Sequence, residues 1–279
     1  MRQDFARAAA SYDEAAVLAR ETGRRMAERL DLVKIAPKRI VDIGCATGDG
    51  IRELQRRYPR ALPLAIDYAL PMLDAVRRQA PLLQHLRGRA PRPVNADVRA
   101  LPLASGSLDL AWSNLMLHWL DEPQTAFAEL HRVLDVGGLL MFSMLGPDTL
   151  KELRVATKKV MRSGIHGDGG SGTARRFLDM HDIGDMLVHA GFADPVMDME
   201  MMTLTYRRPR DFLADQRHLG VRDGLLGARG WREWRRVFGA WQPVDGLLPA
   251  SFEIVHGHAW KAAPRTAPDG RAIVRFATG

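Results

Sequence analysis

The stretch that decides the fold is R-I-V-D-I-G-C-A-T-G, residues 39–48. Its first half is a short apolar run with β-branched side chains, which is typical of a strand buried on both faces. Glycines follow at positions 44 and 48, and a helical pattern then runs over residues 51–58. The unit is therefore a strand, a glycine loop and a helix. Such a loop lets the backbone approach a ligand closely and points N–H groups toward it.

The second apolar run, residues 62–66, ends in Asp67, which is where α/β folds place an acid that hydrogen-bonds a ribose diol. That pairing fits a nicotinamide dinucleotide or S-adenosylmethionine. The loop departs from the dinucleotide pattern G-x-G-x-x-G, because position 46 is Ala and position 49 is Asp. Asp42, at the loop entry, would repel a pyrophosphate but attract the ammonium group of a methionine moiety. These features favour S-adenosylmethionine.

Strand and helix patterns continue to alternate after this unit. Strands are expected near residues 94–96, at 108–113 and at 139–145, with a helix over 123–134. Such alternation predicts an α/β fold with a doubly wound, Rossmann-like sheet. We expect seven strands, mostly parallel, with an antiparallel last strand and a helical insertion or lid.

The second half of the chain has a different rhythm. We expect a basic helix over 148–161, a mobile glycine-rich loop at 164–172, a helix over 180–190 and a last strand over 252–260. The segment D-P-V-M-D-M-E-M-M-T-L-T-Y alternates with period two, and its apolar parity switches between Met201 and Met202, which predicts a β-bulge there. The expected divisions are an N-terminal helical cap (1–36), a cofactor-binding core (37–145), a helix and mobile loop (146–178), a core helix and strand (179–206), a basic helical insertion (207–250), and a last strand with tail (251–279).

The insertion contains W-R-E-W-R-R-V-F-G-A-W, in which Trp231, Trp234, Phe238 and Trp241 are expected on one helical face. Residues 207–236 hold nine arginines against four acids. A solvated basic face is the ordinary interpretation of such a run. Docking of an acidic partner is the alternative, if the run lies over the carboxyl edge of the sheet.

Composition narrows the class of protein. The chain has 279 residues, a formal net charge of +7 and a pI of about 10.0. A single cysteine excludes an internal disulfide and an all-thiolate metal site. The N-terminus lacks the apolar region of a signal peptide, and no run approaches the length of a membrane span, so we expect a cytoplasmic protein with no membrane partner. Nucleic-acid methylation is disfavoured, because S-N-L-M lacks the prolines of an Asn-Pro-Pro-Tyr-type motif.

The motifs together resemble a known family. D-I-G-C-A-T-G, A-I-D-Y-A-L-P-M-L, N-A-D-V-R-A-L-P and L-D-L-A-W-S-N-L resemble class I S-adenosylmethionine-dependent methyltransferases. More specifically, F-A-R-A-A-A-S-Y, S-N-L-M-L-H-W, L-G-P-D-T-L-K-E-L-R, F-L-D-M-H-D-I-G-D-M-L and H-A-G-F-A-D-P-V-M-D-M-E resemble the malonyl-acyl-carrier-protein O-methyltransferases of biotin synthesis. The resemblance runs from Phe5 to about Trp260. It implies methyl transfer to the free carboxylate of a malonyl thioester, with malonyl-loaded acyl carrier protein as partner.

The resemblance also implies roles for matching residues. Tyr12 would reach the active site, and Arg217 would contact a carboxylate or phosphate of the substrate. For S-adenosylmethionine, Asp42, Gly44 and Gly48 would hold the methionine part, Asp67 the ribose, and Asp97 with Val98 the adenine. Cys45, Tyr68, Met72 and Asn114 are also expected to bind this cofactor. The chain departs from the pattern at Ala46, where a glycine is usual, and at Tyr68, where a smaller apolar residue is common.

Other interpretations stay open on the residues alone. The acceptor could be a free small carboxylic acid. The motifs S-N-L-M-L-H-W and G-P-D-T-L-K-E-L-R also resemble relatives of the mitochondrial complex I assembly factors, which need not methylate. His256 and His258, two apart on one strand, could bind a metal, but with no third ligand in view buried hydrogen-bonded histidines are favoured and no metal site is expected. A carboxylate acceptor is already ionised at neutral pH and needs no general base, which agrees with the absence of an evident His/Asp or Cys/His pair.

Overall fold

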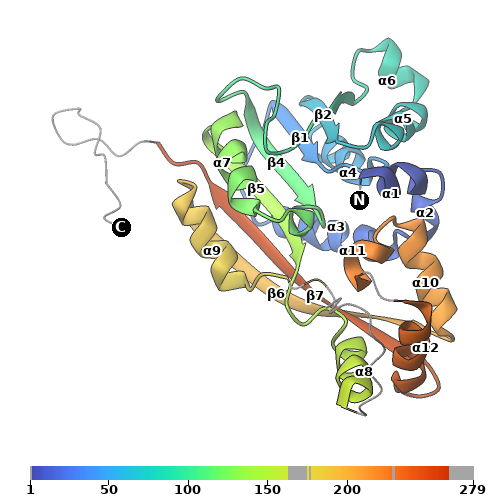
Figure 1. Ribbon diagram of the computed structural model, residues 1–279. Helices are drawn as coiled ribbons and strands as arrows, with labels where there is room; N and C mark the ends of the chain where they lie inside the picture. Colours follow the sequence, from blue (N-terminus) through green and yellow to red (C-terminus); the bar gives the residue numbers. More distant parts are fainter. Residues whose placement is uncertain (1, 163–174, 176, 228–229, 264–279) are drawn as a thin grey trace.

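The computed structural model describes residues 2–162, 175, 177–227 and 230–263. Its centre is one seven-stranded sheet in the order β3-β2-β1-β4-β5-β7-β6 (Figure 1). The strands are β1 (Arg39–Ile43), β2 (Leu62–Asp67), β3 (Arg92–Asn95), β4 (Leu108–Asn114), β5 (Leu134–Leu145), β6 (Ala193–Tyr206) and β7 (Leu248–Trp260). β1 to β5 pair in parallel, and β7 is antiparallel to both β5 and β6. The expected doubly wound sheet with an antiparallel last strand is confirmed.

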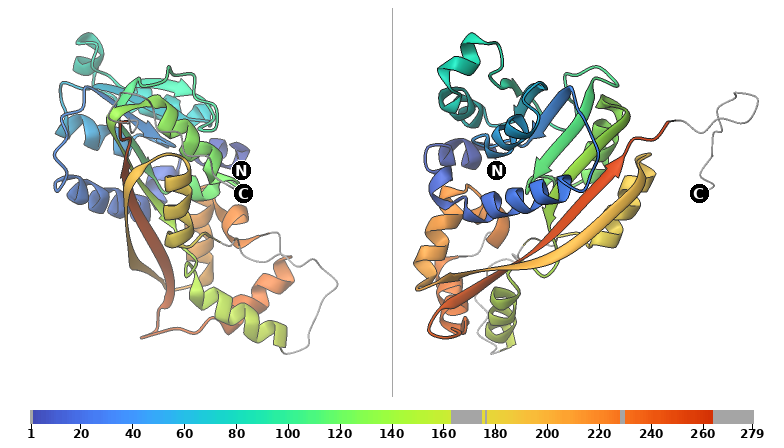
Figure 2. Two further views of the ribbon diagram at one scale, coloured as in Figure 1. Left: turned by 90° about the vertical axis from the view of Figure 1, so that its left-hand side faces the viewer. Right: turned by 180° about the vertical axis from the view of Figure 1, so that it is seen from behind.

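Helices cover both faces of this sheet (Figure 2). One face carries α3 (Val17–Leu30), α4 (Asp49–Arg57) and α5 (Leu70–Gln79), and the other carries α7 (Pro123–Val133) and α9 (Met180–His189). Trp112 is fully buried under the first set, and on the other face Phe127 of α7 packs against Phe142 with the rings tilted by 56° and 5.7 Å between their centroids. Burial of each such side chain contributes about 1.5–3 kcal/mol. Among the described residues, no helix combines the length and the apolar character needed to cross a bilayer.

A second helical group packs on the far end of β6 and β7. It comprises α8 (Lys151–Arg162), α10 (Pro209–His218), α11 (Arg222–Leu226) and α12 (Trp231–Ala240) around a core of its own. Within it Trp234 stacks on Phe238 at 5.2 Å, and buried Trp241 donates its indole N–H to Pro249 O. Trp231, expected on the same buried face, is instead 69% exposed. The predicted mobile loop at 164–172 lies outside the described residues.

The β-bulge predicted between Met201 and Met202 is wrong. Met201 pairs with Glu253 and Met202 with Phe252 in unbroken register, and the only irregularity between the two strands lies between Ala193 and Val196. The apolar parity switches for another reason. α9 covers one face of β6 near its start, where Met197 packs, whereas the second helical group covers the opposite face near its end. A strand whose two halves are covered on opposite faces needs no extra residue.

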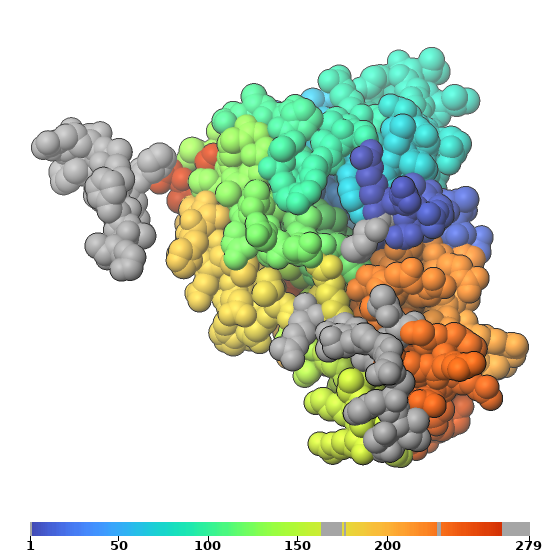
Figure 3. Space-filling view, in the orientation of Figure 1, coloured from blue at the N-terminus to red at the C-terminus, as the bar shows by residue number. Residues whose placement is uncertain are grey.

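The N-terminal segment forms three helices where one was expected over residues 4–30. They are α1 (Arg2–Ala8), α2 (Tyr12–Ala15) and α3. α3 lies on the sheet, whereas α1 packs its Ala8 against Ala69 and Met72 near the β1 loop. α2 lies against α10, which brings the start of the chain beside the insertion (Figure 3). The two breaks let this segment turn from the sheet face toward the carboxyl ends of the strands.

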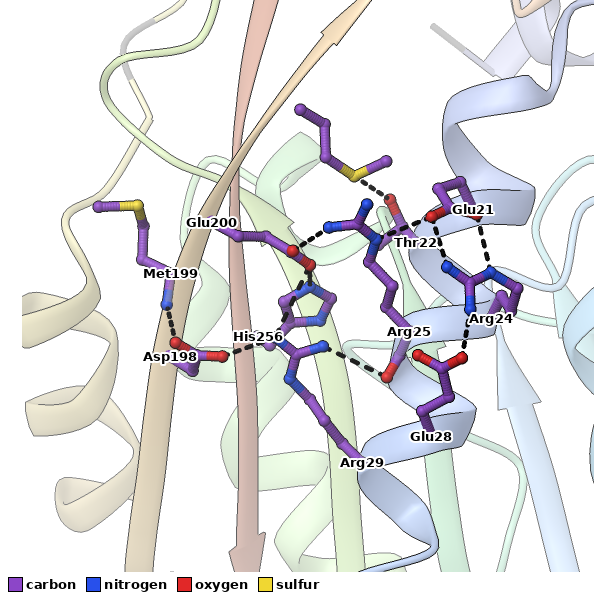
Figure 4. Close-up of polar contacts among 11 residues, drawn as sticks. Glu21, Thr22, Arg24, Arg25, Glu28, Arg29, Asp198, Met199, Glu200 and His256 are labelled. Carbon is purple, nitrogen blue, oxygen red and sulfur yellow. Dashed lines mark hydrogen bonds and ion pairs between the residues drawn. The ribbon is translucent and has the colours of Figure 1, made fainter.

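An ion-pair network joins α3 to β6 (Figure 4). The Glu200 carboxylate accepts from Arg25 and from Nε2 of buried His256, the latter at 2.7 Å, and Arg29 pairs with Asp198 at 2.6 Å. His256, one of the two histidines considered as metal ligands, therefore bonds a carboxylate. The network joins α3 to β6, the strand at the edge of the sheet.

Candidate active site

The loop after β1 is shaped for close approach of a ligand. Gly44 has φ of +71°, and a Cβ placed there would lie 2.3 Å from Cγ of Met116. Gly44 and Cys45 donate their backbone N–H groups to Ile66 O, at 2.8 and 3.0 Å. Ala46, where the resemblance implies a glycine, adopts φ of +45°, which is uncommon for a residue with a Cβ. The N–H of Ala46 is held by Asp67, so the neighbouring acid stabilises this conformation.

Asp67 lies at the end of β2 with only 8% of its surface exposed. One carboxylate oxygen accepts from Ala46 N at 3.1 Å and the other from Ala69 N at 2.8 Å. Burial raises the pKa of Asp67, although these backbone donors oppose the shift. Each oxygen retains acceptor capacity beyond its backbone bond, which is what a ribose diol requires.

Asp42 has a different environment from the one expected. Its carboxylate is 2% exposed and accepts from the backbone N–H of Ile51, one of the unpaired donors in the first turn of α4. A Cβ at Gly50 would lie 2.6 Å from Asp42 Oδ2, so only glycine fits there. Burial raises the pKa of Asp42 to about 7, and the charge of Asp67 adds to the effect. Asp42 thus supports the loop from beneath, and it is not among the residues that line the cavity above.

A cavity of about 340 Å³ opens at the carboxyl ends of β1, β2 and β4, and we name it the rim cavity. It lies where the sheet order reverses between β1 and β4, which is the usual ligand position in open α/β sheets. Eight of the residues expected at the site line it, namely Tyr12, Gly44, Asp67, Tyr68, Met72, Asp97, Val98 and Asn114. Cys45 and Gly48 belong to the loop but do not line the cavity.

Two polar residues of the rim cavity already have protein partners. Asp97 is paired with Arg99 through both carboxylate oxygens, at 3.0 and 2.6 Å, and this pairing lowers its pKa. Asn114 donates to Ala19 O of α3 at 2.7 Å and accepts from Ser143 Oγ at 2.8 Å. Asn114 therefore fixes α3 to the sheet at the edge of the cavity, and its side chain is held in one orientation.

Tyr12 stands between the rim cavity and a smaller one. The second cavity, about 80 Å³, is lined mainly by apolar side chains, including some from α3, β5, β6 and α11, and we name it the apolar pocket. Four residues line both cavities, namely Phe5, Tyr12, Leu115 and Trp119. Burial, followed by the charges of Asp67 and Asp49, raises the pKa of Tyr12, so its hydroxyl stays protonated at neutral pH. Tyr12 is thus a hydrogen-bond donor at the junction of the two cavities.

Arg217 lies away from both cavities, and its expected contact with the substrate stays a prediction. The side chain lies on the exposed face of α10 and lines neither the rim cavity nor the apolar pocket. Its neighbours on the helix, Asp215 and Gln216, face the apolar pocket instead, and Gln216 is 3% exposed. The sequence showed that α10 carries Arg217, but it could not show which face of α10 points toward the apolar pocket.

Trp119 and Arg175 line the rim cavity, and sequence reasoning did not identify either as a site residue. Trp119 ends the short 3₁₀ turn η1 (Leu117–Trp119), and Arg175 approaches its ring from a distant part of the chain, with 5.9 Å from the guanidinium carbon to the ring centroid. Trp119 belongs to the motif S-N-L-M-L-H-W, so a signal for it was present. His118 beside it is buried, and burial together with the charge of Arg175 lowers its pKa to about 3.

The rim cavity suits a nucleoside-containing cofactor with a cationic group. Its floor is the glycine loop whose close packing against Met116 leaves no room for a Cβ. Asp67 supplies acceptors for a diol, and Val98, Met72 and Tyr68 supply apolar and aromatic surface for a base. The lining acids Asp67, Asp97 and Asp121 outnumber the lining arginines, which favours a cation.

Comparison with known proteins agrees with this geometry. A family model described as a methyltransferase domain matches residues 41–142. A malonyl-[acyl-carrier protein] O-methyltransferase of Gallionella capsiferriformans is 49% identical, with 99% of this chain and 94% of that protein covered. The protein of the same name from Laribacter hongkongensis is 48% identical with the same coverage. Among solved structures, a methyltransferase of Bacillus halodurans superposes with a TM-score of 0.59 over 85% of this chain and 99% of its own, at 14% identity.

Proposed function

The chain belongs to the malonyl-[acyl-carrier protein] O-methyltransferase family, and from that premise we propose that it methylates the free carboxylate of a malonyl thioester carried by acyl carrier protein, an early step of biotin synthesis. The observation that carries the proposal is the identity of 49% over 99% of the chain, which includes the second helical group as well as the cofactor-binding core. S-adenosylmethionine is the cofactor, and it supplies a methyl group activated on a sulfonium sulfur.

The glycine loop and the acid after β2 hold the cofactor in this proposal. Asp67 accepts from the ribose hydroxyls while its backbone bonds to Ala46 and Ala69 keep the carboxylate in place. Asp97 and Val98 flank the adenine ring. Asp42 acts through the loop, since its carboxylate bonds the first turn of α4 rather than facing the rim cavity. The net negative lining stabilises the positive charge of the bound donor.

The proposed acceptor needs no strong base from the protein. A malonyl carboxylate is ionised at neutral pH, so it attacks without losing a proton. His118 has a pKa near 3 and lies beside the site, and such a histidine is too weak a base to take a proton from an acceptor of higher pKa. What the protein contributes is placement of the carboxylate in line with the methyl group and exclusion of water. Tyr12 suits this placement, because its protonated hydroxyl lies where the two cavities meet.

The carrier protein is proposed to dock on the basic side of the second helical group. The exposed arginines among the described residues of this region are Arg207, Arg208, Arg210, Arg217, Arg222, Arg232, Arg235 and Arg236. The partner of such a surface is expected to be acidic, and complementary charge raises the association rate and orients the encounter. The KM for malonyl-carrier should therefore rise with ionic strength, whereas the KM for malonyl-pantetheine should change little.

Methyl transfer from labelled S-adenosylmethionine tests the proposal. Purified protein is incubated with malonyl-carrier, acetyl-carrier and free malonate, and label is measured in a base-labile methyl ester. We expect ester on malonyl-carrier, none on acetyl-carrier and little on malonate. If the protein binds S-adenosylhomocysteine in calorimetry yet labels no malonyl thioester, the chain is a cofactor-binding protein without this activity. Preferential labelling of free malonate would establish a small-acid methyltransferase instead.

A further inference from the structure

We propose that Arg175 binds the carboxylate of the acceptor, the role that the sequence pattern had suggested for Arg217. The inference rests on the proposed function, because it concerns how the same site recognises a malonyl thioester. It assigns recognition of the acceptor carboxylate to a residue between α8 and α9, outside the motifs of the cofactor-binding core. Its basis is the charge and the hydrogen bonding of the rim cavity.

The rim cavity needs a cation if its acceptor is an anion. Asp67, Asp97 and Asp121 line it, and their summed charge repels a carboxylate. Arg99 and Arg175 are the arginines of its lining. Arg99 is committed, because its Nε and Nη2 bond the two oxygens of Asp97 in the paired geometry that arginine and carboxylate prefer. Arg175 is therefore the cation of this lining that remains for a ligand.

The guanidinium of Arg175 is held in place by hydrogen bonds, but only one of its three nitrogens makes them within the described chain. Its three hydrogen bonds to described residues all leave from Nη2, and they reach Trp119 O, Leu120 O and Asp121 Oδ1, each at 3.0 Å. Nε and Nη1 make no hydrogen bond within the described chain and are left to bind a carboxylate. Asp121 is a weak competitor, because its side chain is 93% exposed and surface ion pairs contribute little.

The surroundings of Arg175 connect it to the reaction. Its guanidinium lies over Trp119, which lines both the rim cavity and the apolar pocket together with Tyr12. Arg175 also lines a neighbouring cavity of about 390 Å³ that includes His118 and Asp121. A carboxylate bound here stands beside Tyr12, at the junction through which an acyl group would meet the donor methyl.

The chemistry makes this contact selective for the substrate over the product. One carboxylate oxygen bonds Arg175, and the other forms a bond to the methyl carbon while the carbon–sulfur bond breaks and leaves its electron pair on sulfur. No proton is transferred. The ester formed has no charge, so its attraction to Arg175 is largely lost and product release is favoured. An acetyl thioester lacks the carboxylate and would leave the guanidinium unpaired.

Binding measurements on Arg175→Gln test the inference. Malonyl-pantetheine and its methyl ester are titrated into the protein saturated with S-adenosylhomocysteine. We expect the wild type to bind the acid at least about 10-fold more tightly than the ester. Arg175→Gln should bind the two equally and should raise the KM for malonyl-carrier at least about 10-fold, with binding of S-adenosylhomocysteine unchanged. Arg175→Lys, which keeps the charge but not the planar fork, should recover part of the preference.

Two further variants test whether the preference for the acid depends on Arg175 alone: Arg56→Gln is the control, and Arg217→Gln tests the alternative arginine. Arg56→Gln removes an exposed partner of Glu53 on α4 and should behave as the wild type. A preference for the acid that survives in Arg175→Gln, or that disappears in Arg217→Gln, would overturn the inference. These results are separable from the proposed function. A wild type that methylates no malonyl thioester refutes the function itself, whereas a wild type that does so and matches Arg175→Gln refutes only the role of Arg175.

Discussion

Replacing Asp42 with asparagine should change the pH dependence of stability in a direction set by burial. The carboxylate is 2% exposed, and its pKa is raised from the ordinary 3.8 to about 7. Between these two values the folded protein holds a proton that the unfolded chain releases. The free energy of unfolding of the wild type therefore falls as the pH rises from about 4 through about 7. The asparagine variant has no such group and should lack this loss.

The size of the effect follows from the same two values. One pKa unit corresponds to about 1.4 kcal/mol, so ionising Asp42 in the folded state costs at most about 4 kcal/mol. About two of these pKa units fall between pH 5 and pH 8, and relaxation around the charge reduces their effect, so we expect about 1–3 kcal/mol over that range. At pH 5 the two proteins should differ by at most about 2 kcal/mol, because the asparagine oxygen can still accept from Ile51 N and only ionisation in the unfolded chain separates them. At pH 8 the variant should melt about 4–8 °C higher.

The assay is urea unfolding of both proteins without cofactor at pH 5, 6, 7 and 8. Asp109→Asn is the matched control. Burial opposes ionisation of Asp109 as well, but Arg39 and the N–H groups of Lys38 and Arg39 outweigh it and lower the pKa of this carboxyl. Its loss should therefore destabilise the protein at neutral pH and matter less as the pH falls through the pKa of Asp109. A stability difference between wild type and Asp42→Asn that is constant across this range would refute the reasoning.

Four other variants probe the site and its support. Gly44→Ala should abolish cofactor binding measured by calorimetry, because the new Cβ falls 2.3 Å from Cγ of Met116 and the residue must hold a positive φ. Asp67→Asn should weaken S-adenosylhomocysteine binding about 10- to 100-fold, since the amide loses one acceptor for the diol or the loop, and unchanged affinity would remove Asp67 from the ribose site. Tyr12→Phe should lower kcat on malonyl-pantetheine about 10-fold while leaving cofactor affinity intact, and full activity would make the tyrosine a packing residue. Glu200→Ala should destabilise the protein by about 2–4 kcal/mol in urea unfolding, because it leaves buried His256 without its carboxylate and removes one of the two carboxylates that pair with Arg25, and a loss below about 0.5 kcal/mol would show the network to be dispensable.

Local sequence signals predicted which residues meet in the rim cavity, although their contacts with the cofactor stay a prediction. Gly44, Asp67 and Val98 lie within short segments whose strand, loop and helix patterns place them at the carboxyl edge of the sheet. Asp42 was expected to face the cofactor, but its side chain lies at the end of β1 and does not line the rim cavity. Its carboxylate is used by the first turn of α4, a preference that depends on Gly50 leaving room for it.

The acceptor side could not be predicted in the same way. Arg217 and Gln216 are neighbours on α10, and which of them turns inward depends on how that helix rests on α2 and β6. Arg175 reaches Trp119 across 56 positions of the chain, and no local pattern announces such a contact. The bulge expected at Met201 failed for a related reason, because period-two alternation assumes that one set of helices covers the whole strand.

The pairing of Tyr206 with Leu248 has a consequence for the evolution of this architecture. The chain leaves β6 and re-enters β7 at adjacent positions of one ladder, so everything between them hangs from a single closed stem. We expect a graft at that stem, with residues 207–247 exchanged for those of a relative, to change the carrier preference, while the residues that line the rim cavity stay in place. Carrier docking and cofactor binding would then be encoded by separate segments, so that one cofactor-binding core could acquire new acceptors.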